Sequence, residues 1–388
     1  MKKKNDLFLI LALCLAAACS IGLYMNTSGI LFSPIADSLN EKRGSVAVFY
    51  TIMTFSSAIF STIIPAFATN KNFRKIYICG IIGALCSLIL MANAAGLIML
   101  YIGGLFLGAS FSTYFMVVLT TIINCSFEEN TGTITGFVFS FSGVAGAIFS
   151  PVLSAVVNTY GWRMGFYVMA GLTVILCLPG VFAKMKIERE KKDDLSAQTD
   201  FNYLSAGFIL LTMMSVCYLF IPALPQHFPG LALSKNFDET IGPLLVSASM
   251  IGNIVFKLIA GVLADRLGSI KALFVMSVIT LAGIVLMFFA GSDTLALAAA
   301  FLIGAIFSIT AVLGAYHTRE LFGNDSYKKA YSIVSLAGNT SNALSIAAVG
   351  YIYDFFSSYD PALILAMILD VVAFALALFA EKTVNRKK

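Results

Sequence analysis

Lys257 and Asn253 are the residues whose types and spacing point most directly to chemistry. They stand four positions apart in the stretch "IGNIVFKLIAGVLADRLGSIKAL", which begins at Ile251 and whose first half is otherwise almost wholly apolar. Residues four apart share one face of a helix, so an ammonium and a carboxamide would project to the same side. The ammonium could hold an anion by its charge, and the amide could either donate a hydrogen bond to that anion or satisfy a neighbouring helix.

The element that carries these side chains is expected to be a transmembrane helix. The 388 residues are 59% hydrophobic and 12% charged, whereas soluble domains carry about 25% charged residues. The mean hydropathy is +0.91. A bilayer span needs about 20 apolar residues, and the composition predicts an all-α membrane protein with twelve spans, at 7–36, 45–69, 75–93, 97–124, 133–157, 164–184, 203–226, 240–264, 270–290, 294–322, 328–353 and 361–380.

The distribution of basic residues predicts the orientation of these spans. With both termini inside, 20 of the 25 basic residues fall in inner segments and 4 in outer ones, as the positive-inside rule requires. We therefore expect a multi-pass protein of the cell membrane with both termini cytoplasmic. This bias accounts for the net charge of +5 and makes a nucleic-acid partner unnecessary.

A polar segment divides the chain into halves of similar length. We expect an N-terminal six-helix bundle at 1–184, a cytoplasmic linker at 185–202 and a C-terminal six-helix bundle at 203–388, which suggests a duplicated unit. Weak internal similarity supports duplication, because "PAFATNKNFRK" from Pro65 stands where "GVLADRLGSIK" stands from Gly261. In both stretches a lysine opens the next helix.

Lys257 is the one basic residue left within a span, and its isolation admits two readings. A charge at mid-span costs about 2.5–3.5 kcal/mol on insertion scales and usually faces a water-filled cavity, which favours a ligand role. In the other reading it reaches the cytoplasmic interface or pairs with Asp370, the one acidic residue at mid-span. Asp265 lies eight residues further on, about 12 Å along a helix, which is too far for a lysine side chain to span comfortably.

The sequence argues against a metal, a cofactor or an enzymatic site. Its seven cysteines form no Cys-x-x-Cys pair, and neither of its two histidines lies at mid-span. An enzyme would need convergent nucleophiles or acid–base groups within the spans. His317 stands beside Arg319 and Glu320 near the end of the tenth span, where a gate network and an ordinary interfacial cluster both stay open.

The loop between the eighth and ninth spans has a motif with a physical logic. Gly261 permits close helix contact, Asp265 can pair with a helix N-terminus or a basic group, Arg266 follows it, and Gly268 turns the chain. With twelve spans and a central linker, this loop resembles the signature of the major facilitator superfamily. Further stretches are similar to its monocarboxylate porter and oxalate:formate antiporter branch, namely "GWRMGF" from Gly161, "ELFG" from Glu320, "GYIYD" from Gly350 and "EKRGSV" from Glu41.

This resemblance implies a role for Lys257. Members of the branch often carry an arginine four residues before the first glycine of the loop motif, where this chain has Lys257, and that arginine binds the carboxylate of the substrate. Two departures limit the match. Asn253 stands where some monocarboxylate porters have an aspartate that takes part in proton coupling. Asn339 and Asn342 are what the eleventh span offers in place of the second cation of oxalate carriers.

The superfamily also implies which further residues line a central cavity, because spans one, four, seven and ten do so there. The polar or aromatic candidates in those spans could equally anchor or pack, and they are Tyr24, Asn26, Tyr114, Tyr218 and Tyr316. Asp370 falls in the twelfth span, which is peripheral in the superfamily, and we do not assign it to the site.

These observations predict a secondary transporter that moves a small organic anion, a monocarboxylate before a dicarboxylate, by alternating access. We expect it to act as a monomer in the lipid bilayer, with a proton as a candidate coupling ion. The alternatives are an exporter of drugs or amphipathic compounds, against which "SGVAGAIFSPVLS" lacks the Gly-Pro-x-x-Gly-Gly pattern, and a non-transporting membrane sensor.

The predicted orientation can be checked by labelling the central linker. A cysteine introduced at Gln198 should resist a membrane-impermeant thiol reagent added to intact cells and should react after the cells are opened, because the positive-inside rule places this segment in the cytoplasm. The unsubstituted chain, with its seven cysteines, supplies the background. Labelling of position 198 from outside would contradict the topology.

Overall fold

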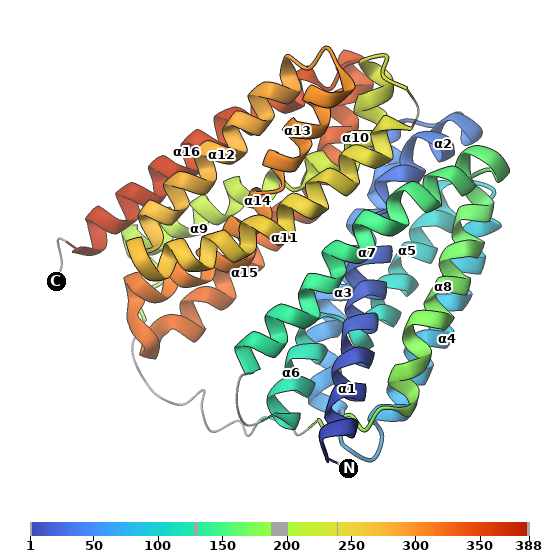
Figure 1. Cartoon of the computed structure of the whole chain (residues 1–388), viewed down its shortest axis with the longest axis horizontal. Coiled ribbons are helices and arrows are strands. Elements are labelled where there is room, and N and C mark those ends of the chain that lie inside the picture. The colour runs from blue at the N-terminus through green and yellow to red at the C-terminus, as the bar shows by residue number, and fades with distance from the viewer. Residues whose placement is uncertain (1, 128–130, 188–200, 239, 386–388) are drawn as a thin grey trace. The chain divides into compact units, whose positions relative to one another are not determined.

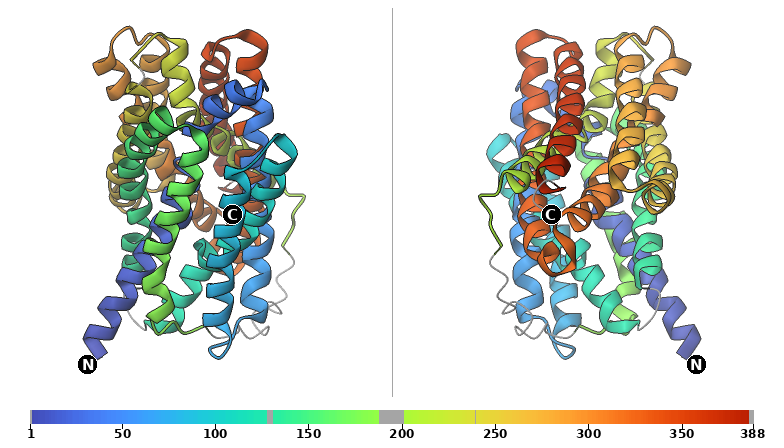
Figure 2. Two further views of the ribbon diagram at one scale, coloured as in Figure 1. Left: turned by 90° about the vertical axis from the view of Figure 1, so that its right-hand side faces the viewer. Right: turned by 90° about the vertical axis from the view of Figure 1, so that its left-hand side faces the viewer.

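The fold is all-helical and forms two compact units, Met1–Lys191 and Lys192–Lys388. The structure of the protein is a computed structural model that describes residues 2–127, 131–187, 201–238 and 240–385. No β-strand occurs in these ranges. Within each unit the long helices run alongside one another as a bundle (Figures 1 and 2), so the expected all-α fold is confirmed.

The N-terminal unit contains eight α-helices and two short irregular helical segments in its described part. The first span is broken by a π-helical segment and the fourth by a 3₁₀ turn. In chain order the elements are α1 (Lys2–Ala17), η1 (Ala18–Leu23), α2 (Gly29–Leu39), α3 (Arg43–Phe67), α4 (Phe73–Ala92), α5 (Leu97–Phe111), η2 (Ser112–Tyr114), α6 (Met116–Ser126), α7 (Thr131–Tyr160) and α8 (Trp162–Phe182).

The C-terminal unit repeats this plan in its described residues, with the tenth span broken by a second π-helical segment. Its long helix α15 contains the end of the expected tenth span and the whole of the expected eleventh, joined at Gly323, whose φ of 72° departs from helical geometry. The elements are α9 (Ala206–Phe220), α10 (Ala223–Ser234), α11 (Ile241–Leu267), α12 (Ser269–Phe288), α13 (Asp293–Ile303), α14 (Ile306–Ser308), η4 (Ile309–Leu313), α15 (Gly314–Phe356) and α16 (Asp360–Asn385).

Eleven of the twelve expected spans are helices long and apolar enough to cross a membrane, counted over the described residues. The exception is the expected span 328–353. It is helical as the second half of α15, but it falls outside that group because its stretch "AGNTSNALS" carries several polar side chains. Much of the expected linker, 188–200, lies outside the described residues, as does position 198.

Matching close contacts inside the two units confirm the duplicated pattern. A Cβ added to Gly108 would collide with the carbonyl oxygen of Met53, and one added to Gly304 would collide with the carbonyl oxygen of Ser249. Both pairs are related by a shift of 196 positions, the same shift that aligns the loops at Pro65 and Gly261. Glycine therefore lets the fourth span meet the second, and the tenth meet the eighth, at backbone distance.

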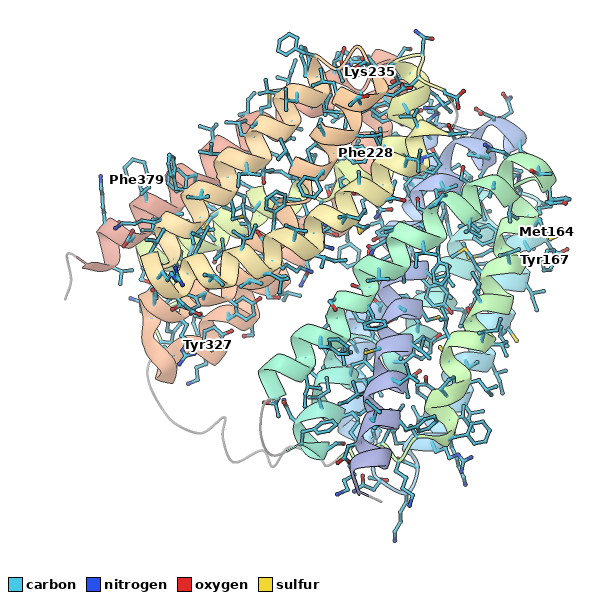
Figure 3. All side chains as sticks on the ribbon, viewed as in Figure 1. Met164, Tyr167, Phe228, Lys235, Tyr327 and Phe379 are labelled. Carbon is cyan, nitrogen blue, oxygen red and sulfur yellow. The ribbon has the colours of Figure 1, made fainter. Side chains whose placement is uncertain are left out.

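The outer faces of both units expose large apolar side chains, as a lipid environment favours. Figure 3 shows Tyr167 on α8 and Phe379 on α16 pointing away from their bundles, and they are 41% and 58% exposed. Phe228 on α10, in contrast, is fully buried. A soluble protein rarely exposes continuous apolar surface of this kind, so these faces fit hydrocarbon better than water.

The tight crossing at Gly304 can be tested by filling it. We expect Gly304→Leu to destabilise the protein by about 1–3 kcal/mol, the usual cost of overpacking, because a side chain there has no room beside α11. Thermal unfolding of the purified protein in detergent would measure this. Gly171→Leu on α8 is the matched control, since a Cβ at Gly171 meets nothing within 4 Å. Equal midpoints for the two variants would contradict the close crossing.

Candidate functional site

Helix α11 places Lys257 at the border of its packed face. Asn253, Phe256 and Ala260 on that face are buried, whereas Leu258 on the opposite side is 71% exposed. Lys257 lies between the two and is partly exposed. One turn further on, a Cβ added to Gly261 would meet nothing within 4 Å, so the side of the helix next to the lysine is open within its unit.

The ammonium of Lys257 makes no hydrogen bond and no ion pair with any residue that the structure describes. The alternative pairing with Asp370 does not occur, because the two side chains form no ion pair. The carboxylate of Asp370 accepts instead from Ser277 on α12. Reaching the helix end is also excluded by length, since Gly268 lies eleven residues away, about 16 Å along the axis. The charge therefore stands in a span without a described counter-charge.

Asn253 also retains unused hydrogen-bonding capacity. Its side chain is 5% exposed, its Nδ2 contacts only the sulfur of Met250 at 3.9 Å, and its Oδ1 has no partner among described residues. It lies about 6 Å along the helix from Lys257. The two groups thus form a cation and an unsatisfied amide on one face of α11.

Helix α13, which packs against α11, ends beside Asn253. A Cβ on Gly304 would approach the backbone nitrogen of Asn253 to 2.8 Å, and beyond Gly304 the chain passes through α14 and the π-helical segment η4. Single-turn π segments concentrate at functional sites. Interrupted spans at corresponding places in the two halves mark binding sites in transporters, and the breaks in spans four and ten fit that pattern.

Three of the remaining candidates are engaged inside the N-terminal unit. The hydroxyl of Tyr24 lies 2.6 Å from Thr173 Oγ1 and 3.3 Å from the hydroxyl of Tyr114. Thr173 donates its proton to the carbonyl of Met169 at 2.7 Å. The donors therefore run from Tyr114 to Tyr24 to Thr173 and end on a backbone carbonyl. Asn26 is committed too, because its Nδ2 donates to the Ser142 carbonyl at 3.1 Å.

Some candidates of the C-terminal unit hydrogen-bond to other protein groups, and others do not. Tyr218 is buried, with its hydroxyl 2.7 Å from Ser277 Oγ. Asn342 donates to the carbonyl of Leu219 at 3.1 Å, and the exposed Asn339 donates to a serine of its own helix. Tyr316 is partly buried and makes no hydrogen bond with a described residue. Lys257 and Tyr316 are thus the candidates without a hydrogen bond to a described residue, and Asn253 has only its long contact with sulfur.

The loop motif lies at the junction of α11 and α12. Asp265 and Arg266 are exposed, and Gly268 ends α11 with a φ of 82°. The carboxylate at the N-terminus of α12 belongs to Glu320, whose Oε2 accepts from the backbone nitrogen of Ser269 at 3.1 Å and from its hydroxyl. Asp265 does not fill that role.

His317 completes a cluster that joins α12 to α15. Its Nδ1 lies 2.6 Å from Ser269 Oγ. Because the proton of that hydroxyl goes to Glu320, Nδ1 is the donor and carries a proton. The imidazole is 1% exposed. The cluster is an interhelical contact around the N-terminus of α12. Three carboxylate, thiol or imidazole ligands for a metal do not meet anywhere in the described residues.

Sequence reasoning missed Ser277 and Thr173 and set Asp370 aside. A lone serine or threonine in an apolar span carries little signal by itself. Asp370 did carry one, as the one acidic residue at mid-span, and the structure buries it among α9, α12 and α16 with Ser277 as its partner.

Comparison with known proteins agrees with this architecture. The family model of the Major Facilitator Superfamily matches residues 13–220 and again 203–388. The structure is similar to a crystal structure of a mutant of the nucleoside transporter NupG, with a TM-score of 0.74 and 14% identity over 97% of this chain and 99% of that one.

Two crystal structures of a bacterial homologue of the human lysosomal transporter Spinster are similar as well. The inward-facing occupied form gives a TM-score of 0.69 over 98% of this chain and 97% of that one. The unoccupied form gives 0.70 over 100% and 98%, both at 14% identity. At this identity the likeness concerns the fold. The match of the family model over both halves shows that the chain belongs to the Major Facilitator Superfamily, the non-enzymatic secondary transporters of membranes.

Proposed function

We propose that this transporter moves a small organic monoanion, with monocarboxylates as the first candidates, and that Lys257 binds the negative charge. The observation that carries the proposal is the unpaired ammonium of Lys257 within α11. A charge at this depth costs about 2.5–3.5 kcal/mol. An anionic substrate would offset that cost during binding, whereas no described residue does so in its absence.

No second cation stands at the corresponding positions of the described residues, which favours one negative charge over two. The residue 196 positions earlier is Ser61, whose hydroxyl donates to the Ala58 carbonyl of its own helix at 3.0 Å. In the eleventh span Asn339 and Asn342 are neutral and already bonded. Asn253 adds an amide beside the cation, which suits the second oxygen of a carboxylate or a neighbouring hydroxyl.

A second candidate is the export of amphipathic compounds, which an apolar groove in the C-terminal unit favours. The groove has a volume of about 550 Å³ between α9 and α15, where Val216, Phe220 and Leu344 line it. Its hydroxyls are used internally, since Thr340 donates to the Leu336 carbonyl at 2.9 Å and Ser341 to the Val216 carbonyl at 2.7 Å. Such a surface would receive an acyl chain or ring better than a carboxylate.

The experiment that separates these functions is a binding screen on the purified protein. Lactate, pyruvate and formate represent monocarboxylates, succinate and oxalate represent dicarboxylates, uridine represents nucleosides, and a single-chain detergent-like cation represents amphipathic compounds. The proposal expects stabilisation by at least one monocarboxylate in a thermal-shift assay, because ligands that bind the folded state raise its melting temperature. Stabilisation by uridine or the amphipathic cation alone would contradict it.

Replacing the lysine tests the role of its charge. We expect Lys257→Gln to weaken binding of the best monocarboxylate by about 10- to 100-fold, since a charge-assisted hydrogen bond contributes about 1.5–3 kcal/mol. Uptake into proteoliposomes should fall in parallel while membrane insertion stays intact. Lys271→Gln on α12, an exposed lysine, is the matched control and should bind normally. Wild-type affinity and rate in Lys257→Gln would make the lysine structural.

The loop after α11 is proposed to serve the conformational cycle. Asp265→Asn should lower the initial rate of transport and leave the equilibrium affinity largely unchanged, because Asp265 lies at the helix end and away from Lys257. Rates in proteoliposomes and binding in detergent measure the two effects separately. Glu381→Gln, which removes one carboxylate from the end of α16, should change neither. A large loss of affinity at an unchanged rate would assign Asp265 to the substrate site instead.

A further inference from the structure

The buried carboxyl group of Asp370 lies in the core of the C-terminal unit, apart from Lys257. Its side chain is 1% exposed. Along α16, the residues on its face include Ala366 and Ala373, both fully buried. These flanking side chains are small, and α16 packs against both α9 and α12. The group is therefore enclosed by protein on its helix face.

Two hydroxyl groups form a hydrogen-bonded chain that leads to this carboxyl group. Ser277 Oγ on α12 donates to Asp370 Oδ1 at 3.4 Å, and the hydroxyl of Tyr218 on α9 lies 2.7 Å from Ser277 Oγ. A serine hydroxyl has one proton, so Tyr218 must be the donor in the second bond. The donors run from Tyr218 to Ser277 to Asp370, across three helices.

The hydroxyl chain of the N-terminal unit differs from that of the C-terminal unit in its final acceptor. There the donors run through Tyr24 and Thr173 and end on the Met169 carbonyl, an acceptor that does not take up a proton. Tyr24 and Tyr218 lie in the first span of their units, and Thr173 and Asp370 lie in the sixth. The two units thus place a similar chain at similar positions, but the C-terminal chain ends on a group that can bind a proton.

No cation among the described residues compensates Asp370. On α9 the titratable side chains are Cys217 and Tyr218, and on α12 the single charged residue is Lys271, which is exposed and six positions from Ser277. On α15 the stretch 332–350 has no titratable side chain. The titratable side chains of α15 lie before this stretch, from Tyr316 to Tyr331, and after it, from Tyr351 to Asp354. The other charged side chains of α16 are near its ends, at Asp360, Glu381 and Lys382.

A buried carboxylate with one long hydrogen bond and no cation is poorly stabilised. Removing a charge from water costs several kcal/mol unless it is paired, and a bond of 3.4 Å is at the weak end of hydrogen-bond geometry. Protonation removes the charge and supplies a donor. The enclosure, the absence of a described counter-charge and the directed hydroxyls all favour a carboxyl group that exchanges a proton.

We propose that Asp370 is a proton-binding site, reached through the hydroxyls of Tyr218 and Ser277, and that its proton is the ion coupled to solute movement. The proton is taken up on the carboxylate oxygen and released from it, so no other reactant is required. The coupling part rests on the proposed function. The binding part concerns the protein alone and can be tested without a solute.

Infrared spectroscopy of the purified protein tests proton binding directly. The wild type should show the carbonyl band of a protonated carboxylic acid at a pH where exposed carboxyl groups are ionised, and the band should be lost in Asp370→Asn, which retains the shape of the side chain. Asp293→Asn, an exposed residue at the start of α13, is the matched control and should retain it. Equal spectra for wild type and Asp370→Asn across the pH range would overturn the proposal.

A second variant keeps the test valid if Asp370→Asn does not fold. Ser277→Ala removes the donor to the carboxylate, and loss of a hydrogen bond to the charged form favours the neutral form. The band should then persist to a more alkaline pH than in the wild type. Tyr24→Phe, which shortens the chain in the N-terminal unit, should leave the band unchanged. A band that Ser277→Ala leaves in place would overturn the hydroxyl route.

Coupling is measured in proteoliposomes with a pH-sensitive dye inside and a lactate gradient across the membrane. Wild-type protein should acidify or alkalinise the lumen as lactate moves, and Asp370→Asn should lose this proton movement while still exchanging labelled for unlabelled lactate. Proton movement that survives in Asp370→Asn would overturn the coupling role. If the infrared band behaves as expected and lactate does not move at all in the wild type, the monocarboxylate function fails and the proton site stands.

Discussion

Within hydrocarbon every polar group must find its partner inside the protein, and this constraint organises both units. Helices meet it for the backbone, and side-chain hydroxyls meet it by donating to carbonyls of their own or neighbouring helices, as Thr173 and Ser341 do. Many such groups follow the rule, and three departures among the described residues bear on function. Lys257 lacks any described partner, the Asn253 carbonyl oxygen is buried and unbonded, and Asp370 has a single long bond.

Duplication supplies an internal reference for these departures. The crossings at Gly108 and Gly304 repeat with the same spacing, so the two units share a scaffold. On that scaffold the N-terminal unit has Ser61 where the C-terminal unit has Lys257, and its hydroxyl chain ends on a carbonyl rather than on Asp370. In the described residues, the lysine and the carboxyl group at mid-span therefore belong to the C-terminal unit, while the N-terminal unit satisfies the equivalent positions with neutral groups. We infer that charge recognition and proton binding are functions of the C-terminal unit.

Most of the fold could be predicted from the sequence, because hydropathy decides where helices lie in a membrane. The breaks could not be predicted, since hydropathy does not distinguish the π-helical segments at Ala18–Leu23 and Ile309–Leu313 from the α-helices around them. The isolation of Lys257 could be anticipated from composition. The burial of Tyr24 and Tyr114 could not, because it depends on which helices pack together. The partner of the α12 N-terminus was also hidden, since Glu320 is 51 positions from Ser269 and the local motif offered Asp265 instead.

The central claim is that the positive charge at position 257 holds the substrate, and restoring that charge chemically tests it most directly. Lys257→Cys should lose monocarboxylate binding, and alkylation with 2-bromoethylamine, which rebuilds an ammonium on a side chain of lysine length, should restore it. Methylation of the same thiol should not, and the wild type treated with each reagent controls for the native cysteines. Binding that is unaffected by Lys257→Cys, or restored equally by methylation, would contradict the account.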